Sequence, residues 1–144
     1  MFDELKIAQA TAYLLHKAGG TMEHIKVMKL LYLADRLSWQ RYGYSISNDE
    51  EDEYFFDCLS ESDTEILEEV FATFGNYKPF ALVEYTHNPK YIPEWEDPQG
   101  RSKPISLNTL LTKLGKTPSE IESILEQQTE KGEMDNLFKG LINA

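Results

Sequence analysis

Apolar residues recur at helical spacing from Thr21 to Gly43, and this pattern predicts one long helix. Thr21 is suited to the N-cap of this helix, and Gly43 to the left-handed position after its last turn. Two apolar stripes cover most of its circumference: Ile25, Met28, Tyr32 and Trp39 form one, and Val27, Leu30, Leu31, Ala34 and Leu37 form the other. A helix that is apolar on nearly all sides is buried, so we expect the other helices to pack around it.

The remaining segments are typical of shorter helices separated by turns. Periodicity, capping residues and Gly or Pro breaks predict helices over residues 3–18, 59–75, 78–87, 106–115, 117–131 and 135–142. Ser62 with Glu65 and Thr117 with Glu120 have the spacing of a capping box, and Ser106 is suited to an N-cap. The prediction is a mostly α fold, one compact domain over residues 1–144 with six or seven helices. A small β element near residues 44–56 stays open as an alternative to a helix start.

Periodicity also predicts which helix faces are buried. In the helix over residues 3–18 we expect one inward stripe, widened by Ile7, Ala10 and Leu14. That stripe consists of Leu5, Ala8, Ala12 and Leu15. In the helix over residues 78–87 we expect Phe80 and Val83 to point inward, and Leu82 stays open as a third inward residue.

Composition and charge narrow the class of protein. The chain has 144 residues, 41% of them hydrophobic and 12% aromatic, which suits one globular domain with a real core. A net charge of −11 disfavours wrapping of nucleic acid and binding to anionic membranes. The single cysteine, Cys58, has no internal disulfide partner, and the acidic start does not resemble a signal peptide. We therefore expect a cytoplasmic protein.

The charge is unevenly distributed. Between Asp49 and Glu69 there are eleven acidic residues and no Lys or Arg. The central helix, in contrast, carries Lys26, Lys29, Arg36 and Arg41. We therefore expect one acidic side of the molecule, which is suited to a partner with a basic surface.

The side chains that could carry out chemistry form weak patterns. His87 with Glu84, Glu94 and Asp97 could form a metal or acid–base cluster, but the spacing matches no zinc motif. The favoured interpretation is that His87 ends its helix and contacts Trp95 or the backbone. The run from Asp49 to Glu53 lacks the alternating ligands and central Gly of a calcium loop, and the chain has no phosphate-binding Gly-rich loop. We therefore predict no catalytic residue, no bound metal and no cofactor.

Residues that could contact a protein partner come from four features. The two tryptophans could anchor a partner, because Trp is enriched at binding hot spots, although Trp39 is more consistent with core packing. Lys29 and Arg36 lie on a narrow polar line of the central helix and could grip a carboxylate or phosphate, or else pair internally. With His87 and the acidic turn, the candidate partner-binding residues are Trp95, Trp39, Arg36, Lys29, His87, Glu50, Glu51, Asp52 and Glu53.

A series of short motifs resembles the Panacea antitoxin domain, the SocA-like family found with phages and prophages. The series runs through Lys29-Leu-Leu-Tyr-Leu-Ala-Asp-Arg36, Tyr42-Gly43, Ile46-Ser-Asn-Asp49, Leu59-Ser60 with Asp63, Phe74-Gly75, Thr86-His87, Pro93-Glu-Trp95, Asp97-Pro-Gln-Gly100 and Ser102-Lys-Pro-Ile105. The resemblance spans roughly residues 20 to 125. The chain is shortened in the middle and lacks a Gly-Pro-Val segment that the family carries after Asn48-Asp49.

The resemblance implies a non-enzymatic antitoxin that binds and neutralises a cognate protein toxin. Direct binding to nucleic acid or membrane is not expected, and the oligomeric state is left undetermined. The alternative is an acidic, phage-type inhibitor that mimics DNA and blocks a nuclease or DNA-binding protein. A small hydrolase that uses His87 and nearby carboxylates is the least favoured class.

Overall fold

The computed structural model describes residues 4–44, 59–97, 99 and 105–131 of the chain. Within these ranges all regular secondary structure is helical. The helices are α1 (Glu4–Lys17), α2 (His24–Tyr42), α3 (Glu61–Phe74), α4 (Pro79–Thr86), α5 (Leu107–Lys113) and α6 (Pro118–Lys131). The predicted mostly α fold is confirmed. The β element considered near residues 44–56 and the helix expected over 135–142 lie, apart from Tyr44, outside the described residues.

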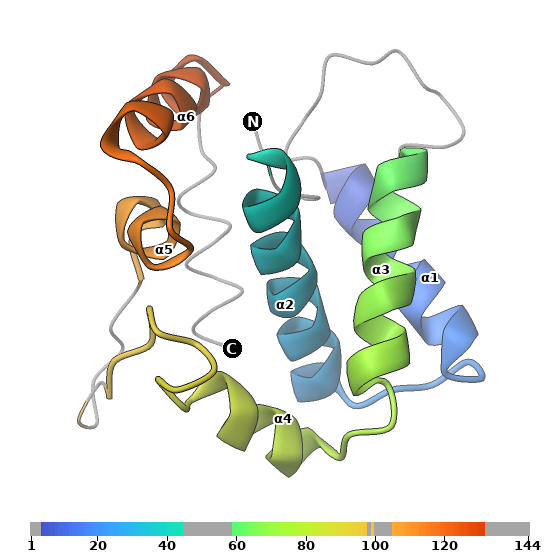
Figure 1. Cartoon of the computed structure of the whole chain (residues 1–144). Helices are drawn as coiled ribbons and strands as arrows, with labels where there is room; N and C mark the ends of the chain where they lie inside the picture. Colours follow the sequence, from blue (N-terminus) through green and yellow to red (C-terminus); the bar gives the residue numbers. More distant parts are fainter. Residues whose placement is uncertain (1–3, 45–58, 98, 100–104, 132–144) are drawn as a thin grey trace.

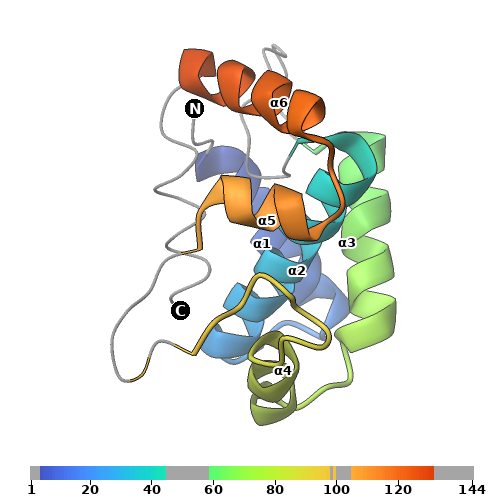
Figure 2. The ribbon, with the colours of Figure 1, turned by 60° about the vertical axis from the view of Figure 1, so that its left-hand side comes forward.

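Helix α2 runs through the middle of the molecule, as its apolar pattern predicts. In Figure 1, α1 and α3 lie on one side of α2, α5 and α6 lie on the other, and α4 lies below its first turn. In Figure 2, α5 and α6 have come to the front, with α6 above α5. The apolar side chains that α2 buries are Val27, Leu30, Leu31, Tyr32, Leu33, Ala34 and Trp39. They pack in one cluster with residues from all the other helices, so α2 organises the core.

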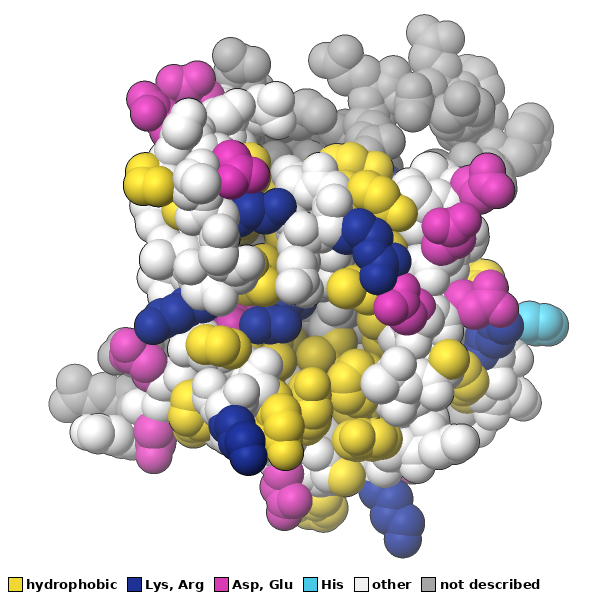
Figure 3. All heavy atoms as spheres, viewed as in Figure 1, with side chains coloured by type: hydrophobic (Ala, Val, Ile, Leu, Met, Phe, Trp, Pro, Cys, Tyr) yellow, Lys and Arg dark blue, Asp and Glu magenta, His cyan; other side chains and the backbone are white. Residues whose placement is uncertain are grey.

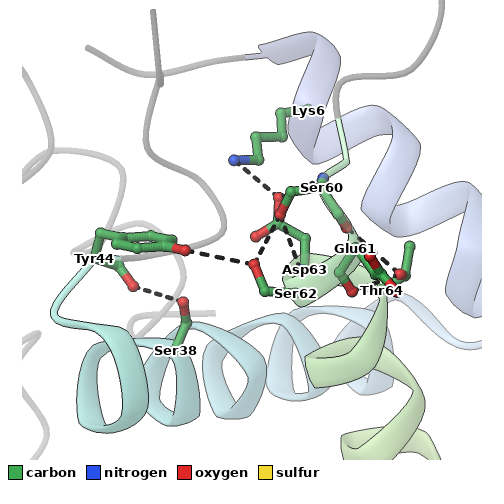
Figure 4. Close-up of polar contacts among 8 residues, drawn as sticks. All are labelled: Lys6, Ser38, Tyr44, Ser60, Glu61, Ser62, Asp63 and Thr64. Atoms are coloured by element: carbon green, nitrogen blue, oxygen red, sulfur yellow. Dashed lines mark hydrogen bonds and ion pairs between the residues drawn. The ribbon is translucent and has the colours of Figure 1, made fainter. Parts of the chain in front are cut away.

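The two ends of α2 differ in how well local chemistry predicts them. The expected N-cap at Thr21 is wrong, because the helix begins at His24 and Glu23 holds the cap position without a side-chain hydrogen bond. Gly43 does end the helix in the left-handed conformation, with φ of 77°, and its N–H donates to the carbonyl of Trp39. Just beyond, Ser38 Oγ donates to the Tyr44 carbonyl at 2.6 Å (Figure 4), which turns the chain away from the helix axis.

Helix α3 begins with a capping box, but one that lies two residues earlier than expected. Ser60 Oγ accepts from the Asp63 N–H at 3.1 Å, and Asp63 Oδ2 accepts from the Ser60 N–H at 3.0 Å. The predicted box of Ser62 and Glu65 is therefore wrong. The Asp63 carboxylate also pairs with Lys6 Nζ of α1 at 3.0 Å, and both side chains are buried (Figure 4). One carboxylate thus both starts α3 and holds α1 against it.

This buried ion pair explains why the predicted face of α1 is only partly right: Ala10 and Leu14, expected to widen the inward stripe, are buried, but the main stripe is not. Lys6, Ala10 and Leu14 lie four residues apart on one stripe, and all three are buried. Leu5, which was expected to point inward, is 52% exposed, and Ala8 and Ala12 are exposed as well. Because the pair with Asp63 turns Lys6 toward α3, it fixes the rotation of α1 about its axis.

The ends of the later helices follow their capping residues. Pro79 occupies the first turn of α4, where its missing N–H costs nothing. Ser106 Oγ accepts from the Thr109 N–H at 3.1 Å and caps α5. Thr117 and Glu120 exchange backbone and side-chain hydrogen bonds at 3.1 and 3.2 Å, so the predicted capping box of α6 is confirmed.

The inward face of α4 was predicted correctly only in part, because the expectation for Phe80 is wrong. Phe80 is 84% exposed, whereas Leu82 is fully buried and Val83 is half-buried. The short helix has little amphipathic character of its own, so its orientation depends on its packing against α2 and on the loop after it. The exposed Phe80 leaves an apolar side chain at the edge of the molecule.

Candidate partner-binding surface

A polar stripe of α2 faces the loop that follows α4. Lys29, Tyr32 and Arg36 are three and four residues apart, so they share one side of the helix. Tyr32 Oη donates to Glu94 Oε2 at 2.5 Å. Arg36 binds both carboxylate oxygens of Glu94, with Nε–Oε2 at 2.6 Å and Nη2–Oε1 at 3.1 Å. The Glu94 side chain is 0% exposed, so this cluster fastens the loop to α2.

The environment of this cluster keeps Tyr32 protonated. Burial raises the pKa of the Tyr32 phenol above its usual range, and the negative charge of Glu94 raises it further, while Arg36 acts in the opposite direction. A neutral phenol can only donate to the carboxylate beside it. Tyr32 is therefore a fixed hydrogen-bond donor in this cluster.

His87 and Trp95 stack at the end of α4. The backbone N–H of His87 donates to the Val83 carbonyl at 2.9 Å, and its imidazole lies 5.0 Å from the indole ring with an interplanar angle of 11°. The expectation that His87 ends its helix and contacts Trp95 is confirmed. Burial lowers the pKa of His87, the positive charge of Lys29 lowers it further, and Asp97 opposes both. Among the described residues, no group of three His, Cys, Asp or Glu side chains is placed to hold a metal ion.

A depression lined by both apolar and polar side chains lies where α2, α3 and α4 meet. Its volume is about 190 Å³. It is lined by Leu33, Arg36, Leu37 and Gln40 of α2, Glu69, Val70, Thr73 and Phe74 of α3, Tyr85 of α4, and Ile92. In Figure 3 hydrophobic side chains gather in this hollow in the middle of the face, with charged side chains around them. An apolar floor with a polar rim is typical of the centre of a protein–protein interface.

Aromatic side chains continue this depression toward the surface. Tyr85 meets Phe74 edge-on, with ring centroids 4.9 Å apart, and stacks on Tyr91 at 4.7 Å. Tyr91 is an exposed large hydrophobic residue. Rigid aromatic side chains give large contact area at little conformational cost, so this edge is suited to anchor a partner.

Helix α3 carries five acidic residues; three of them are paired, and of the five only Glu69 lines the depression. Arg41 Nη1 binds Glu69 Oε2 at 2.8 Å and lowers the pKa of that carboxyl, and Lys17 Nζ binds Glu68 Oε1 at 3.2 Å. Glu61 and Glu65 are exposed on the same helix. The described half of the expected acidic side is therefore partly neutralised. The acidic turn with Glu50, Glu51, Asp52 and Glu53 lies outside the described residues.

The predicted partner-binding residues do not gather at one place. Trp39 is fully buried in the core, so its indole offers no surface to a partner in this conformation. Arg36 lines the depression and also pairs with Glu94, whereas Lys29, His87 and Trp95 line a small cavity next to it. Their roles in partner binding remain predictions. The apolar lining of the depression was missed, because its residues come from four segments that share no local motif.

The comparisons with known proteins give one match. The model of the family described as antitoxin SocA-like, Panacea domain, matches residues 48–96. The predicted resemblance is thereby confirmed for 49 of the 144 residues, which include α3, α4 and the cluster residue Glu94. The motifs of α2 and those after residue 96 lie outside the match. Neither the curated proteins nor the solved structures contain a match to this chain.

The described helices give no indication of a membrane span. None of them combines the length and the apolar character that a bilayer crossing requires.

Proposed function

We propose that this protein is an antitoxin-type binding protein that neutralises a cognate protein toxin through the depression between α2, α3 and α4. The match of residues 48–96 to the SocA-like antitoxin family is the observation that carries this proposal. The match contains α3, α4 and Ile92, which supply a large part of the lining of the depression. The family relationship and the candidate surface therefore point to the same part of the chain.

The chemistry of the depression supports a macromolecular partner over a small substrate. Six of its ten lining residues are apolar or aromatic, and the others are Arg36, Gln40, Thr73 and Glu69, which pairs with Arg41. The hollow holds about 190 Å³, which is smaller than a typical pocket for a drug-sized ligand of roughly 300–1,000 Å³. A hollow of this size accepts one or two apolar side chains of a partner, as hot-spot anchors do.

A growth assay tests the proposal directly. The chain is produced in bacteria together with the product of the gene beside its own, and growth is compared with that of cells producing either protein alone. The expected result is arrest by the neighbouring protein alone and rescue by co-production. A harmless neighbouring protein, or arrest that persists with both proteins present, would contradict the proposal.

Two matched variants locate the surface. Thr73 at the rim of the depression and Thr112 on α5 are both exposed, and each hydroxyl donates to the carbonyl four residues earlier. Thr73→Arg should abolish rescue and binding, because a bulky charge then overhangs the depression. Thr112→Arg is the control, and it also lines a second groove along α5 and α6. Loss of rescue only with Thr112→Arg would move the interface to that groove.

The DNA-mimic alternative is separated by a competition experiment. The purified complex is titrated with double-stranded DNA. In the antitoxin interpretation an apolar anchor holds the complex, so DNA should not displace the chain. Displacement by DNA, together with near-complete loss of binding when Glu61 and Glu65 are neutralised, would favour the mimic.

A further inference from the structure

The groove along α5 and α6 is separate from the depression, and these two helices are the ones at the front of Figure 2. Its volume is about 780 Å³. Pro118, Ile121 and Leu125 line it on the α6 side, and Asn108 and Thr112 line it on the α5 side. The three apolar residues follow each other at spacings of three and four, so they form one stripe along α6. At the rise of an α-helix this stripe is about 10 Å long, or roughly two turns.

The α6 rim of this groove carries two carboxylates without a counter-charge. Glu122 and Glu126 both line the groove, and both are exposed. In the described part of the chain, no hydrogen bond or ion pair ends on either side chain. Because they are four residues apart, the two carboxylates lie side by side on one face of the helix and repel each other. A cation placed between them relieves this repulsion.

Lys116 also lines the groove, but its charge is used elsewhere. Its Nζ donates to the Gln40 carbonyl in the last turn of α2 at 3.0 Å, where the negative end of the helix dipole favours a cation. The hydrogen bonds from Thr117 lower the pKa of the Glu120 carboxyl, and the charge of Lys116 lowers it further. Lys116 therefore leaves the acidic rim uncompensated. A partner that approaches the groove meets an apolar stripe with two negative charges beside it.

We propose that this groove docks an amphipathic helix of a partner protein, whose apolar side chains contact the stripe and whose Lys or Arg side chains pair with Glu122 and Glu126. Helices that bind in grooves present apolar anchors on one face, over about two turns or more. The four-residue spacing of the two acids fits basic side chains four residues apart on the partner helix. The groove and the depression share no lining residue, so this proposal does not depend on the proposed function.

A designed peptide of this chemistry tests the groove. The probe is a fluorescently labelled synthetic helix of about four turns, with Leu along one face and Lys along the other. Fluorescence anisotropy should show saturable one-to-one binding to the full chain, which weakens with salt because the rim charges are exposed. A peptide of the same composition in shuffled order, and one with Glu in place of every Lys, should each bind at least about tenfold more weakly.

Paired substitutions test the role of the acidic rim. Glu122→Gln combined with Glu126→Gln should weaken binding by about three- to tenfold, because each exposed ion pair contributes little. Glu61→Gln combined with Glu65→Gln is the matched control, since these exposed acids have the same spacing on α3 and the net charge changes equally. The control should leave binding unchanged. Equal weakening by both pairs would indicate unspecific attraction of a cationic peptide to an acidic protein, and would overturn the proposal.

Bulky substitutions test the position of the peptide. Thr112→Arg adds a large cation on the α5 side of the groove and should abolish binding, whereas Thr73→Arg at the depression should not change it. The opposite result, or equal binding of the shuffled peptide, would refute the proposal. Binding that appears only after Phe138→Asp and Leu141→Asp would assign the groove to residues 132–144 of the chain itself. A dimer in sedimentation experiments that Thr112→Arg dissociates would assign it to a second copy, and either outcome would equally overturn the proposal.

Discussion

Removal of the Glu94 carboxylate should destabilise the fold more than any surface substitution. The carboxylate is fully buried and receives three hydrogen bonds, one from Tyr32 and two from Arg36. Glu94→Ala leaves the Tyr32 hydroxyl and the Arg36 guanidinium without their acceptor. Breaking a buried ion pair from one side costs about 3–5 kcal/mol, because the remaining charge has no counterpart.

The exposure of Arg36 and Tyr32 narrows the expected loss of stability in Glu94→Ala. The Arg36 side chain is partly exposed, so it can turn toward water and recover some hydration. Tyr32 is nearly fully buried and cannot, and an unsatisfied buried hydroxyl costs about 1–3 kcal/mol. We therefore expect Glu94→Ala to lower the free energy of unfolding by about 3–4 kcal/mol, a large part of the roughly 5–15 kcal/mol that a domain possesses. Glu94→Gln, which keeps the shape and one acceptor, should cost less.

Urea unfolding followed by far-ultraviolet circular dichroism measures this loss. Glu84→Ala is the matched control, because Glu84 lies on α4 near the same loop and is exposed, so its change should stay within about 0.5 kcal/mol. Tyr32→Phe alone and combined with Glu94→Gln gives the coupling between these two side chains. A Glu94→Ala variant within about 1 kcal/mol of the wild type, with an unchanged slope in urea, would refute the view that this cluster fastens the loop to α2.

Three further predictions concern single positions. Gly43→Ala should cost about 1 kcal/mol in urea unfolding, because Gly43 has φ of 77°, which a residue with a Cβ adopts only with strain. The added methyl itself meets only Ile124 Cδ1, at an ordinary 3.8 Å. A cost near zero would contradict the predicted backbone strain. Leu31→Asp should prevent cooperative folding, since it buries an unpaired charge in α2, and a melt within a few degrees of the wild type would speak against this. The pKa of His87 is lowered from its ordinary value of 6.5, so the unfolded chain takes up a proton at this residue before the folded chain does as the pH falls. The stability of the fold should therefore decline below about pH 6.5. His87→Gln should flatten that part of the Tm–pH profile, and an unchanged profile would contradict the prediction.

The parts of the fold that could be predicted from sequence rest on local chemistry. A helix that is apolar on nearly all sides must be surrounded, which placed α2 at the centre. Gly43, Pro79 and Ser106 each act within one turn of their own position, so their effects on helix ends can be read without knowing the fold. The capping box of α6 is of the same kind.

The errors arise where a distant residue decides the outcome. The rotation of α1 depends on the pair between Lys6 and Asp63, which are separated in the sequence by most of α1, all of α2 and the segments on both sides of α2. Ser60 takes the cap of α3 because Asp63 can serve both as its partner and as the counter-charge of Lys6. Periodicity within one helix contains no information about such a pairing.

The candidate site also combines features that could be predicted from the sequence with features that could not. The line of Lys29 and Arg36 on α2 was visible in the sequence, as was the option that it pairs internally. The acceptor, Glu94, lies 58 residues after Arg36, so its identity could not be predicted from spacing. The depression is harder still, because its lining is assembled from α2, α3, α4 and Ile92 and each contribution alone looks like ordinary core.

The loop after α4 connects the features of this face. Ile92 lines the depression, Glu94 pairs with Arg36, and Trp95 walls the cavity of Lys29, all within four consecutive residues. Three hydrogen bonds fix Glu94, so the residues next to it in the loop have little freedom to move. The Glu94 cluster therefore determines where both Ile92 and Trp95 lie. The polar stripe of α2 is therefore divided between two tasks. Tyr32 and Arg36 hold the loop, whereas Lys29, one turn before Tyr32, lines the small cavity beside His87 and Trp95.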